Sequence, residues 1–458
     1  MSERPDLLVI GSGGAAMAAA IQATELGADV VVVERGTVGG TCVNVGCVPS
    51  KFMLAAAQRQ ATALHNPFHG LSTDADSVNL AALVSQKDEL IGRLRQHKYL
   101  DVAAERGFCI THGTARFTGE TAVDVDGHRY EPRAVIVATG ARPAIPELPG
   151  LDQVDFLTST SALELAELPD RLAIVGAGFV GLEMAQLFAR LGSHVTLIGN
   201  RVAPNADPEL AAGLRRALEA EGITFQSTRP SLVRASNGGF TALLDNGETV
   251  PFDRLLIATG RQANVEDLDL TIAGVETNNS GAIRTGDDLR TSNPQVWAAG
   301  DVTASHQFVY VAAQQGRVAA RNALNGTTEQ IDYRGLPSVI FTTPALASAG
   351  LTETDARSAG LASRSVTFDL ADVPRGIVEQ SVEGTIKIVA DPETRRLLGV
   401  HVLAPNGGEL LLAATYAIKF GLTIDDVANT WAPYLTLNEG LRLAAQQFDA
   451  PGSLSCCA

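Results

Sequence analysis

Cys42 and Cys47 are the residues of this 458-residue sequence with the clearest capacity for chemistry. Four residues separate them, and they lie between a glycine turn, Gly39-Gly40-Thr41, and a segment from 51 to 57 that is typical of a helix. The positive end of a helix dipole and the unpaired N–H groups at a helix N-terminus favour thiolate over thiol. We therefore interpret the two cysteines as a reactive pair.

Two other interpretations of the pair are open. The cysteines could be buried and inert, or they could form half of a zinc site, since four intervening residues lie within the spacing of metal ligands. A zinc site needs a second Cys or His pair, and the nearby candidates, His65 and His69, flank residues 66–68, whose Asn-Pro-Phe sequence indicates a loop. We favour the redox interpretation.

The first element that must support this pair is a strand-turn-helix unit near the N-terminus. A short apolar strand, 7–10, runs into Gly11-Ser12-Gly13-Gly14-Ala15-Ala16 and an alanine-rich helix. The glycines allow a tight turn and the close approach of a pyrophosphate to the helix N-terminus, and Ala16 stands where a third glycine often packs helix on strand. A second strand ends in Glu34, 23 residues after Gly11, where an acid binds the ribose hydroxyls of an adenosine. The unit predicts a bound dinucleotide.

A second copy of this unit begins at residue 172. Its glycines are Gly176, Gly178 and Gly181, and its second strand ends in Gly199-Asn200-Arg201. Gly199 lies 23 residues after Gly176, so the acid of the first copy is absent, and with Arg201 adjacent this favours NADPH over NADH. Two copies imply two dinucleotides, one permanently bound and one exchanging, as in a flavoenzyme that is supplied by a nicotinamide.

The segment from Gly39 to Lys51 resembles the redox motif of the pyridine nucleotide-disulphide oxidoreductases, with both cysteines, Pro49 and Lys51 at matching positions. The resemblance implies FAD as the first nucleotide and a redox-active Cys42–Cys47 disulfide. It makes Cys47 the flavin-proximal, charge-transfer thiol and Cys42 the outer one. It also implies that Glu183 pairs with Lys51 beside the flavin, where negative charge develops on reduction.

Further motifs extend the resemblance over essentially the whole chain. Phe179 resembles the aromatic gate that covers the flavin until a nicotinamide displaces it, although an aromatic that packs its own helix is an equal alternative. Asp301, in Gly300-Asp301, resembles the acid that binds a ribitol hydroxyl of FAD. The cofactor-binding residues that we expect are Gly11, Gly13, Gly14, Ala16, Glu34, Gly40, Thr41, Lys51, Thr139, Gly140, Gly176, Gly178, Phe179, Gly181, Asn200, Arg201, Gly260 and Asp301.

The predicted fold is α/β, with two Rossmann-like dinucleotide-binding domains and a C-terminal α+β dimerisation domain. A composition of 45% apolar and 5% aromatic residues with 44 glycines agrees with this class. We expect an FAD-binding domain formed by residues 1–148 and 267–334, an NADPH-binding domain at 149–266, and a dimerisation domain at 335–458. Cys109 is expected to be a buried core residue.

The C-terminal segment limits the classes of substrate that the protein could reduce. Disulfide-reducing relatives carry a His five residues before a Glu; here Glu439 is kept, but Tyr434 replaces the His. A phenol with a pKa of about 10 is a poor acid for protonating a departing thiolate. Cys456 and Cys457 form an adjacent pair near the C-terminus, and thiolates are the preferred ligands of soft metal ions. An electron relay through this pair, or an incidental pair, are the alternatives.

Tyr434, the Cys456-Cys457 ending and Tyr99 together resemble the mercuric reductase branch of the family. The resemblance implies a homodimer with an active site shared across subunits. In it, Cys456 and Cys457 of the partner subunit capture Hg(II), and Cys42 and Cys47 receive the ion along a path lined by Tyr99 and the partner's Tyr434. Metal ligands are thus Cys42, Cys47, Cys456 and Cys457. Electrons from NADPH then reduce Hg(II) to Hg(0), and this reaction detoxifies mercury.

Two different functions stay open as alternatives. One is a dihydrolipoyl dehydrogenase or glutathione-reductase-like disulfide reductase, which Tyr434 and Gly199 disfavour. The other is a non-catalytic soft-metal-binding protein. Because no Cys-x-x-Cys metal-binding segment precedes residue 7, we expect mercury to arrive from solution thiols or a separate carrier.

Composition also excludes several partners. A net charge of −16 without any run of Lys or Arg argues against nucleic-acid binding. No apolar run reaches the length of about 18 residues that a membrane span needs, and no signal peptide is evident at the N-terminus. Five cysteines, grouped as two, one and two, fit a reducing compartment, so a cytoplasmic location is expected.

Overall fold

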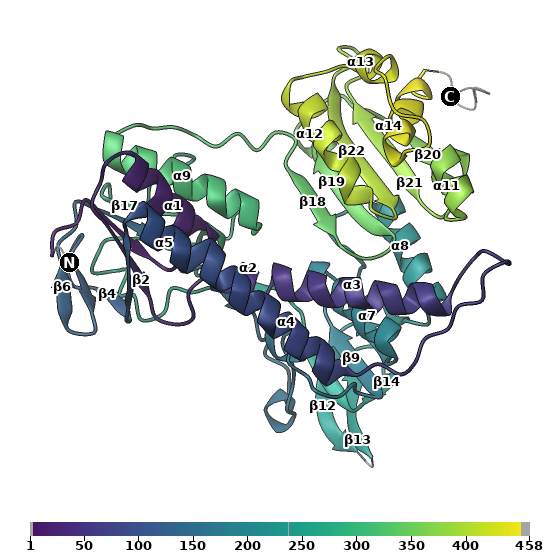
Figure 1. Cartoon of the computed structure of the whole chain (residues 1–458), viewed down its shortest axis with the longest axis horizontal. Helices are drawn as coiled ribbons and strands as arrows, with labels where there is room; N and C mark the ends of the chain where they lie inside the picture. Colours follow the sequence, from purple (N-terminus) through teal and green to yellow (C-terminus); the bar gives the residue numbers. More distant parts are fainter. Residues whose placement is uncertain (1–2, 237, 450–458) are drawn as a thin grey trace.

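The computed structural model describes residues 3–236 and 238–449. Two sheet-and-helix units lie below and to the left of a separate C-terminal domain (Figure 1). Within the described residues, no helix is both long and apolar enough to cross a bilayer.

The first unit is built on a parallel sheet with the strand order β17-β7-β1-β2-β3. All four strand pairs are parallel, and the central strands are buried on both faces, as continuous apolar runs predict. Helix α1 packs beside α9, which follows the last strand to join the sheet (Figure 1). The elements are β1 (Leu7–Ile10), α1 (Gly14–Glu25), β2 (Val30–Glu34), β3 (Cys109–His112), β7 (Ala134–Val137), β17 (Val296–Ala298) and α9 (Val309–Asn325).

Cys109 is exposed, so the prediction that it is a core residue is wrong. It begins β3, the edge strand of the sheet, where the alternation of side chains buries its neighbour Phe108 instead. A small antiparallel sheet of β4 (Ala115–Phe117), β5 (Val123–Val125) and β6 (His128–Tyr130) follows.

A helical segment carries the cysteines between β2 and β3. It consists of α2 (Gly40–Asn44), α3 (Cys47–Leu64), α4 (Leu80–Arg95), a π-helical turn (Gln96–Leu100) and α5 (Asp101–Arg106). Helix α4 begins at Leu80, because the side chain of Asn79 caps it by accepting from the N–H of Ala82 at 3.0 Å.

The second unit repeats the parallel arrangement with the order β11-β10-β9-β15. An antiparallel sheet, β12-β13-β14, is attached to it, and β8 pairs with β16 where the two units connect. The elements are β8 (Ala141–Pro143), α6 (Ser159–Ala162), β9 (Arg171–Val175), α7 (Phe179–Leu191), β10 (His194–Ile198), α8 (Pro208–Ala220), β11 (Thr224–Gln226), β12 (Pro230–Ser236), β13 (Gly239–Leu244), β14 (Thr249–Phe252), β15 (Arg254–Ile257) and β16 (Arg261–Ala263).

The C-terminal domain is an antiparallel sheet, β18-β19-β22-β21-β20, with α12 and α14 packed on it (Figure 1). A 3₁₀ turn (Gly407–Leu410) leads directly into α12. The elements are β18 (Pro337–Ile340), β19 (Ala345–Gly350), α10 (Glu353–Ser358), β20 (Arg364–Asp369), α11 (Pro374–Glu379), β21 (Thr385–Ala390), β22 (Leu397–Ala404), α12 (Leu411–Lys419), α13 (Ile424–Ala428) and α14 (Leu437–Gln446).

A buried ion pair joins this domain to the second unit. Lys387 on β21 is 5% exposed, and its ammonium lies 2.9 Å from a carboxylate oxygen of Asp207, which is 2% exposed. Asp207 also caps α8 by accepting from the N–H of Glu209 at 3.1 Å. Lys387 also lies 3.2 Å from Glu209 and 3.7 Å from Glu353, so the two domains share a cluster of charges.

Candidate active site

The two cysteines lie on two helices that follow one another in the chain. Cys47 is the first residue of α3, and Cys42 lies inside the preceding helix α2. Among the cysteines that the structure describes, Cys42, Cys47 and Cys109 are free thiols. The predicted position of the pair at a helix N-terminus holds for Cys47, whereas Cys42 faces it from the turn before.

The pKa values of the two thiols are shifted in opposite directions. The thiol of Cys42 forms a hydrogen bond with Cys47, and this bond lowers the pKa of Cys47 to about 7; desolvation opposes the shift and the nearby charge of Lys51 supports it. The same hydrogen bond, together with burial, raises the pKa of Cys42. As the pH rises through about 7, Cys47 therefore takes the negative charge while Cys42 keeps its proton.

Lys51 and Glu183 form the ion pair that the resemblance implies. The ammonium of Lys51 lies 2.7 Å from one carboxylate oxygen of Glu183, which is buried on α7. The other oxygen accepts from the backbone N–H of Phe341 at 3.0 Å, and the Phe341 ring lies 4.6 Å below the ammonium. Phe341, which the sequence did not single out, thus completes the surroundings of Lys51 from the C-terminal domain.

Tyr99 lies in the π-helical turn, a local irregularity that often marks functional positions. Burial raises the pKa of Tyr99 to about 12, with a contribution from the charges of Cys42 and Cys47, so its hydroxyl stays protonated. Tyr99 and Cys42 line a cavity of about 620 Å³ that also includes Met17. The structure therefore brings Tyr99 to the outer cysteine.

A larger cavity of about 1830 Å³ also reaches the pair. Both cysteines and Lys51 line it, together with the glycine turns of both strand-turn-helix units. Cys42 is thus accessible from both cavities. Cys42 is therefore the cysteine that borders both spaces.

The part of the large cavity formed by the first unit fits a dinucleotide. The carboxylate of Glu34 accepts from the Ser12 hydroxyl at 2.5 Å and from the N–H of Gly36 at 2.7 Å, which fixes it at the end of β2. A Cβ atom at Gly40, whose φ is +63°, would lie 2.6 Å from the Cα of Gly13. The backbone here leaves room for a ligand and for no additional side chain.

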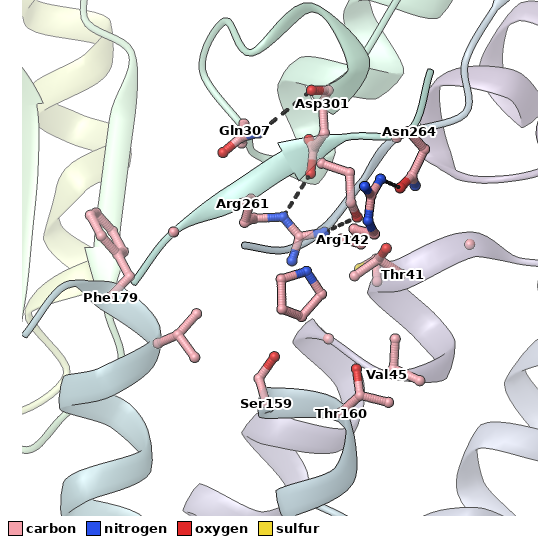
Figure 2. A pocket seen from close by; sticks show the side chains of 18 of the residues that line it. Thr41, Val45, Arg142, Ser159, Thr160, Phe179, Arg261, Asn264, Asp301 and Gln307 are labelled. Atoms are coloured by element: carbon pink, nitrogen blue, oxygen red, sulfur yellow. Dashed lines mark hydrogen bonds and ion pairs between the residues drawn. The ribbon is translucent and has the colours of Figure 1, made fainter. Parts of the chain in front are cut away.

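Asp301 and Arg261 point toward one another into this cavity, as Figure 2 shows. Their charged atoms are 3.5 Å apart. Among the described residues, the buried Nε of Arg261 has no hydrogen-bond partner. Burial raises the pKa of Asp301, and Arg261 only partly opposes this. A carboxyl group with a raised pKa and a guanidinium with a free Nε–H can both form hydrogen bonds with the hydroxyl groups of a ligand's polyol chain.

The remaining predicted residues of the first unit frame the same cavity. The hydroxyl of Thr139 donates to the carbonyl of Asn264 at 2.6 Å, and the N–H of Asn264 donates to the carbonyl of Gly140 at 2.9 Å. Ala16 is fully buried under the turn. Lining the cavity are Gly11, Gly13, Gly14, Glu34, Gly40, Thr41, Lys51, Thr139, Gly140 and Asp301.

The second unit contributes the opposite wall. Phe179 begins α7 and contacts Phe308 edge to face at 6.0 Å between ring centres. In Figure 2 it stands apart from the Asp301–Arg261 pair, at the start of its helix. Gly176, Gly178, Asn200, Arg201 and Gly260 line this wall, whereas Gly181 packs beneath it against the backbone of Gly176.

Arg229 is a cavity residue that the sequence reasoning missed. Its guanidinium donates to the side-chain oxygen of Asn200 from Nε at 2.9 Å and from Nη2 at 3.2 Å, in the amide orientation that satisfies both groups. Strand β11 pairs with β10 and therefore ends at the same sheet edge. In the sequence, the turn that follows β11 was the signal that could have identified Arg229 as a cavity residue.

The predicted residues of the C-terminal domain do not join the site within one chain. Tyr434 is 67% exposed, and none of the interactions among the described residues connects it to Cys42 or Cys47. Glu439 is 1% exposed; Arg442 lies 3.4 Å from one of its oxygens, and the other has no partner in the described part of the chain. Cys456 and Cys457 lie outside the described residues.

Comparison with known proteins identifies the class. The pyridine nucleotide-disulphide oxidoreductase family matches residues 5–316, and the dimerisation domain of that family matches residues 336–445. The chain therefore belongs to the pyridine nucleotide-disulphide oxidoreductases, which confirms the predicted family and fold class. Membership implies the use of a flavin and a pyridine nucleotide, and the dimerisation domain indicates a homodimer.

Within this family, the similar curated relatives include mercuric reductases. The protein of Streptomyces lividans is 48% identical over 99% of this chain and 98% of its own length. The protein of Staphylococcus aureus is 45% identical over 99% of this chain and 84% of its own length. Among solved structures, the HOCl-induced flavoprotein disulfide reductase RclA from Escherichia coli has a TM-score of 0.86 at 27% identity, covering 96% of this chain and 99% of its own.

Proposed function

We propose that this chain is an NADPH-dependent FAD enzyme that reduces Hg(II) to Hg(0). The observation that carries the proposal is the position of Cys42, which lines the smaller cavity with Tyr99 and the larger cavity with Cys47. A dithiol with this double access receives a metal ion from one side and electrons from the other. The likeness to mercuric reductases supports mercury as that ion.

The residues of the larger cavity bind and orient the cofactors. A flavin in this cavity would supply the two-electron chemistry between NADPH and the cysteine pair. Glu34 is positioned for the ribose hydroxyls of FAD and Asp301 for its ribitol chain. Lys51, held by Glu183, stabilises negative charge near the cysteines, and Phe179 would cover the flavin until the nicotinamide displaces it.

The cysteines bind the substrate. Hg(II) is a soft ion that prefers thiolate ligands. Cys47 is already acidic, and Cys42 loses its proton as the metal displaces it. The electron balance is simple: NADPH gives two electrons and leaves as NADP⁺ and a proton, while Hg(II) becomes Hg(0) and both cysteines are released as thiols or thiolates.

Delivery of the ion requires a second subunit. The path runs from Cys456 and Cys457 of the partner subunit, past Tyr99 and the partner's Tyr434, to Cys42. A row of exposed apolar side chains, Leu412, Tyr416 and Phe420 on and after α12, supports dimer formation through the C-terminal domain. The hydroxyl of Tyr99, whose pKa is raised to about 12, would line this route as a neutral group.

NADPH is favoured over NADH because Gly199 carries no acid and Arg201 lines the same wall. The cytoplasm is the proposed location, since a reducing compartment keeps the reactive cysteines as thiols.

The test is to follow NADPH oxidation and mercury vapour release together, with Hg(II) supplied in excess thiol. Both should occur with the purified flavoprotein. The double variant Cys456→Ala/Cys457→Ala should slow turnover of thiol-bound mercury far more than reduction of the flavin by NADPH. Brisk turnover of glutathione disulfide or lipoamide instead would indicate a disulfide reductase. Mercury binding without NADPH consumption would indicate a non-catalytic binding protein.

A further inference from the structure

The two strand-turn-helix units offer an internal comparison at their nucleotide-binding ends. In the first unit, the Ser12 hydroxyl and the N–H of Gly36 fix the carboxylate of Glu34. The second unit has the same spacing but carries Ala177 in place of Ser12 and Gly199 in place of Glu34. The second unit therefore lacks both the acid and the hydroxyl group that holds it, so the two units differ at more than one residue.

The replacement is also enforced by packing. A Cβ atom at Gly199 would lie 3.0 Å from the Cβ of Ala177 and 3.1 Å from its nitrogen, which is tighter than ordinary van der Waals contact. A side chain at this position would require the turn at Ala177 to shift by a few tenths of an ångström. The packing of the second unit therefore favours a glycine at the place where the first unit has an acid.

Two cations occupy the wall beside this glycine. Arg201 corresponds to Gly36 of the first unit, and Arg229 reaches the same wall from the turn after β11. Within residues 3–236 and 238–449, neither arginine forms an ion pair with a carboxylate. Two guanidinium groups without a carboxylate partner, in one wall of a chain with a net charge of −16, mark a place for an anion.

Asn200 has a role that its sequence position did not suggest. Its side-chain oxygen accepts from both Nε and Nη2 of Arg229, which fixes the plane of the guanidinium at the cavity wall. The N–H of Gly199 donates to the carbonyl of Gln226 at 2.9 Å, so the ends of β10 and β11 are fastened together at this point. The arginine is thus pre-oriented before any ligand binds.

We propose that Arg229 is, with Arg201, a ligand of the 2′-phosphate of NADPH and that Asn200 positions Arg229 without binding the phosphate itself. This inference rests on the use of NADPH proposed above and deepens it. Specificity comes from an arginine contributed by the neighbouring strand, not from the residues at the end of β10 alone. A bidentate guanidinium suits a phosphate better than any other side chain.

The inference is tested by calorimetric titration of the flavoprotein with 2′,5′-ADP and with 5′-ADP, which differ only in the 2′-phosphate. Arg229→Ala should weaken binding of 2′,5′-ADP by roughly tenfold or more, as expected for a lost hydrogen bond between charged groups, and should change 5′-ADP binding less than about twofold. Arg229→Lys should recover part of the loss. Asn200→Ala should give a smaller loss with the same selectivity.

Arg234→Ala is the matched control, because this exposed arginine lies on β12, close in the chain but outside the cavity wall. Binding of 5′-ADP reports that each variant is folded. If the wild type prefers 2′,5′-ADP and Arg229→Ala keeps that preference, the role of Arg229 is wrong while NADPH use stands. If the wild type shows no preference, NADPH specificity itself is wrong, and the role of Arg229 with it.

Discussion

The ammonium of Lys51 and the carboxylate of Glu183 lie 2.7 Å apart, although 131 residues separate them in the chain. The same carboxylate accepts from the backbone N–H of Phe341, so one side chain connects the cysteine-bearing helix α3, helix α7 of the second unit and the C-terminal domain. A change in any of these three parts can therefore reach the charge that stands beside the cysteines.

Removing the charge of Lys51 and removing the charge of Glu183 should shift the pKa of Cys47 in opposite directions. Its pKa of about 7 lies below the ordinary value for a thiol, so reaction with iodoacetamide should accelerate as the pH rises through about 7. Lys51→Met removes a charge that lowers this pKa and should move the transition upward. Glu183→Gln removes a charge that raises it and should move the transition downward.

The measurement uses the reduced enzyme in a background with Cys109, Cys456 and Cys457 changed to Ser, which leaves the active-site pair as the reacting thiols. Shifts of the same sign in both variants would contradict the electrostatic explanation and would indicate a general loosening of α3.

Gly40→Ala should release the flavin. The added Cβ would lie 2.6 Å from Gly13 at a backbone angle that favours glycine, so the cradle must open. We expect flavin retention to weaken about tenfold or more, in line with strain of about 1–3 kcal/mol. The absorbance ratio of flavin to protein after dialysis measures this. Gly92→Ala, in helix α4 with open space around it, is the control and should retain flavin fully.

Lys387→Met should destabilise the contact between the second unit and the C-terminal domain. It leaves the 2% exposed carboxylate of Asp207 without its cation, a change that costs about 3–5 kcal/mol in comparable buried pairs. The urea midpoint of unfolding should fall clearly. Adding Asp207→Asn, which keeps the cap of α8, should restore part of the loss. Arg216→Met, an exposed cation on α8, should leave the midpoint almost unchanged.

The exposed apolar row on α12 should be needed for dimer formation. Leu412 and Tyr416 are 59% and 53% exposed, and replacing both with Glu places two charges where a partner would pack. Sedimentation velocity should then show monomers. Ile272→Glu changes an equally exposed apolar residue in another part of the chain and should leave the dimer intact. A dimer that survives the double change would place the interface elsewhere.

The sequence predicted the two strand-turn-helix units well because their signals are local. Glycine spacing, apolar strands and the position of Glu34 lie within about one supersecondary unit and need no tertiary information. The Lys51–Glu183 pair was also predicted, but only because the resemblance supplied it. The roles of Tyr434, Cys456 and Cys457 are predictions that depend on a second subunit and on residues outside the described part of the chain.

The residues that the sequence missed owe their positions to tertiary pairing. Arg229 reaches Asn200 because β11 lies beside β10, and Phe341 reaches Lys51 because the C-terminal domain folds back over α3. Neither relationship leaves a periodic or compositional trace. Cys109 was misjudged for the related reason that its burial depends on which strand forms the edge of the sheet.

The sheet order of the first unit has a consequence for how the protein is made. Strand β17, at residues 296–298, pairs with β7, which ends at residue 137, and Asp301 follows it directly. A nascent chain must therefore emerge past the whole second unit before the first sheet is complete. Because domains fold as they leave the ribosome, the second unit is complete first. If the first unit binds the flavin, as proposed, flavin acquisition becomes a late event of biosynthesis, and a chain that stops before residue 301 cannot form the complete first sheet and its Asp301.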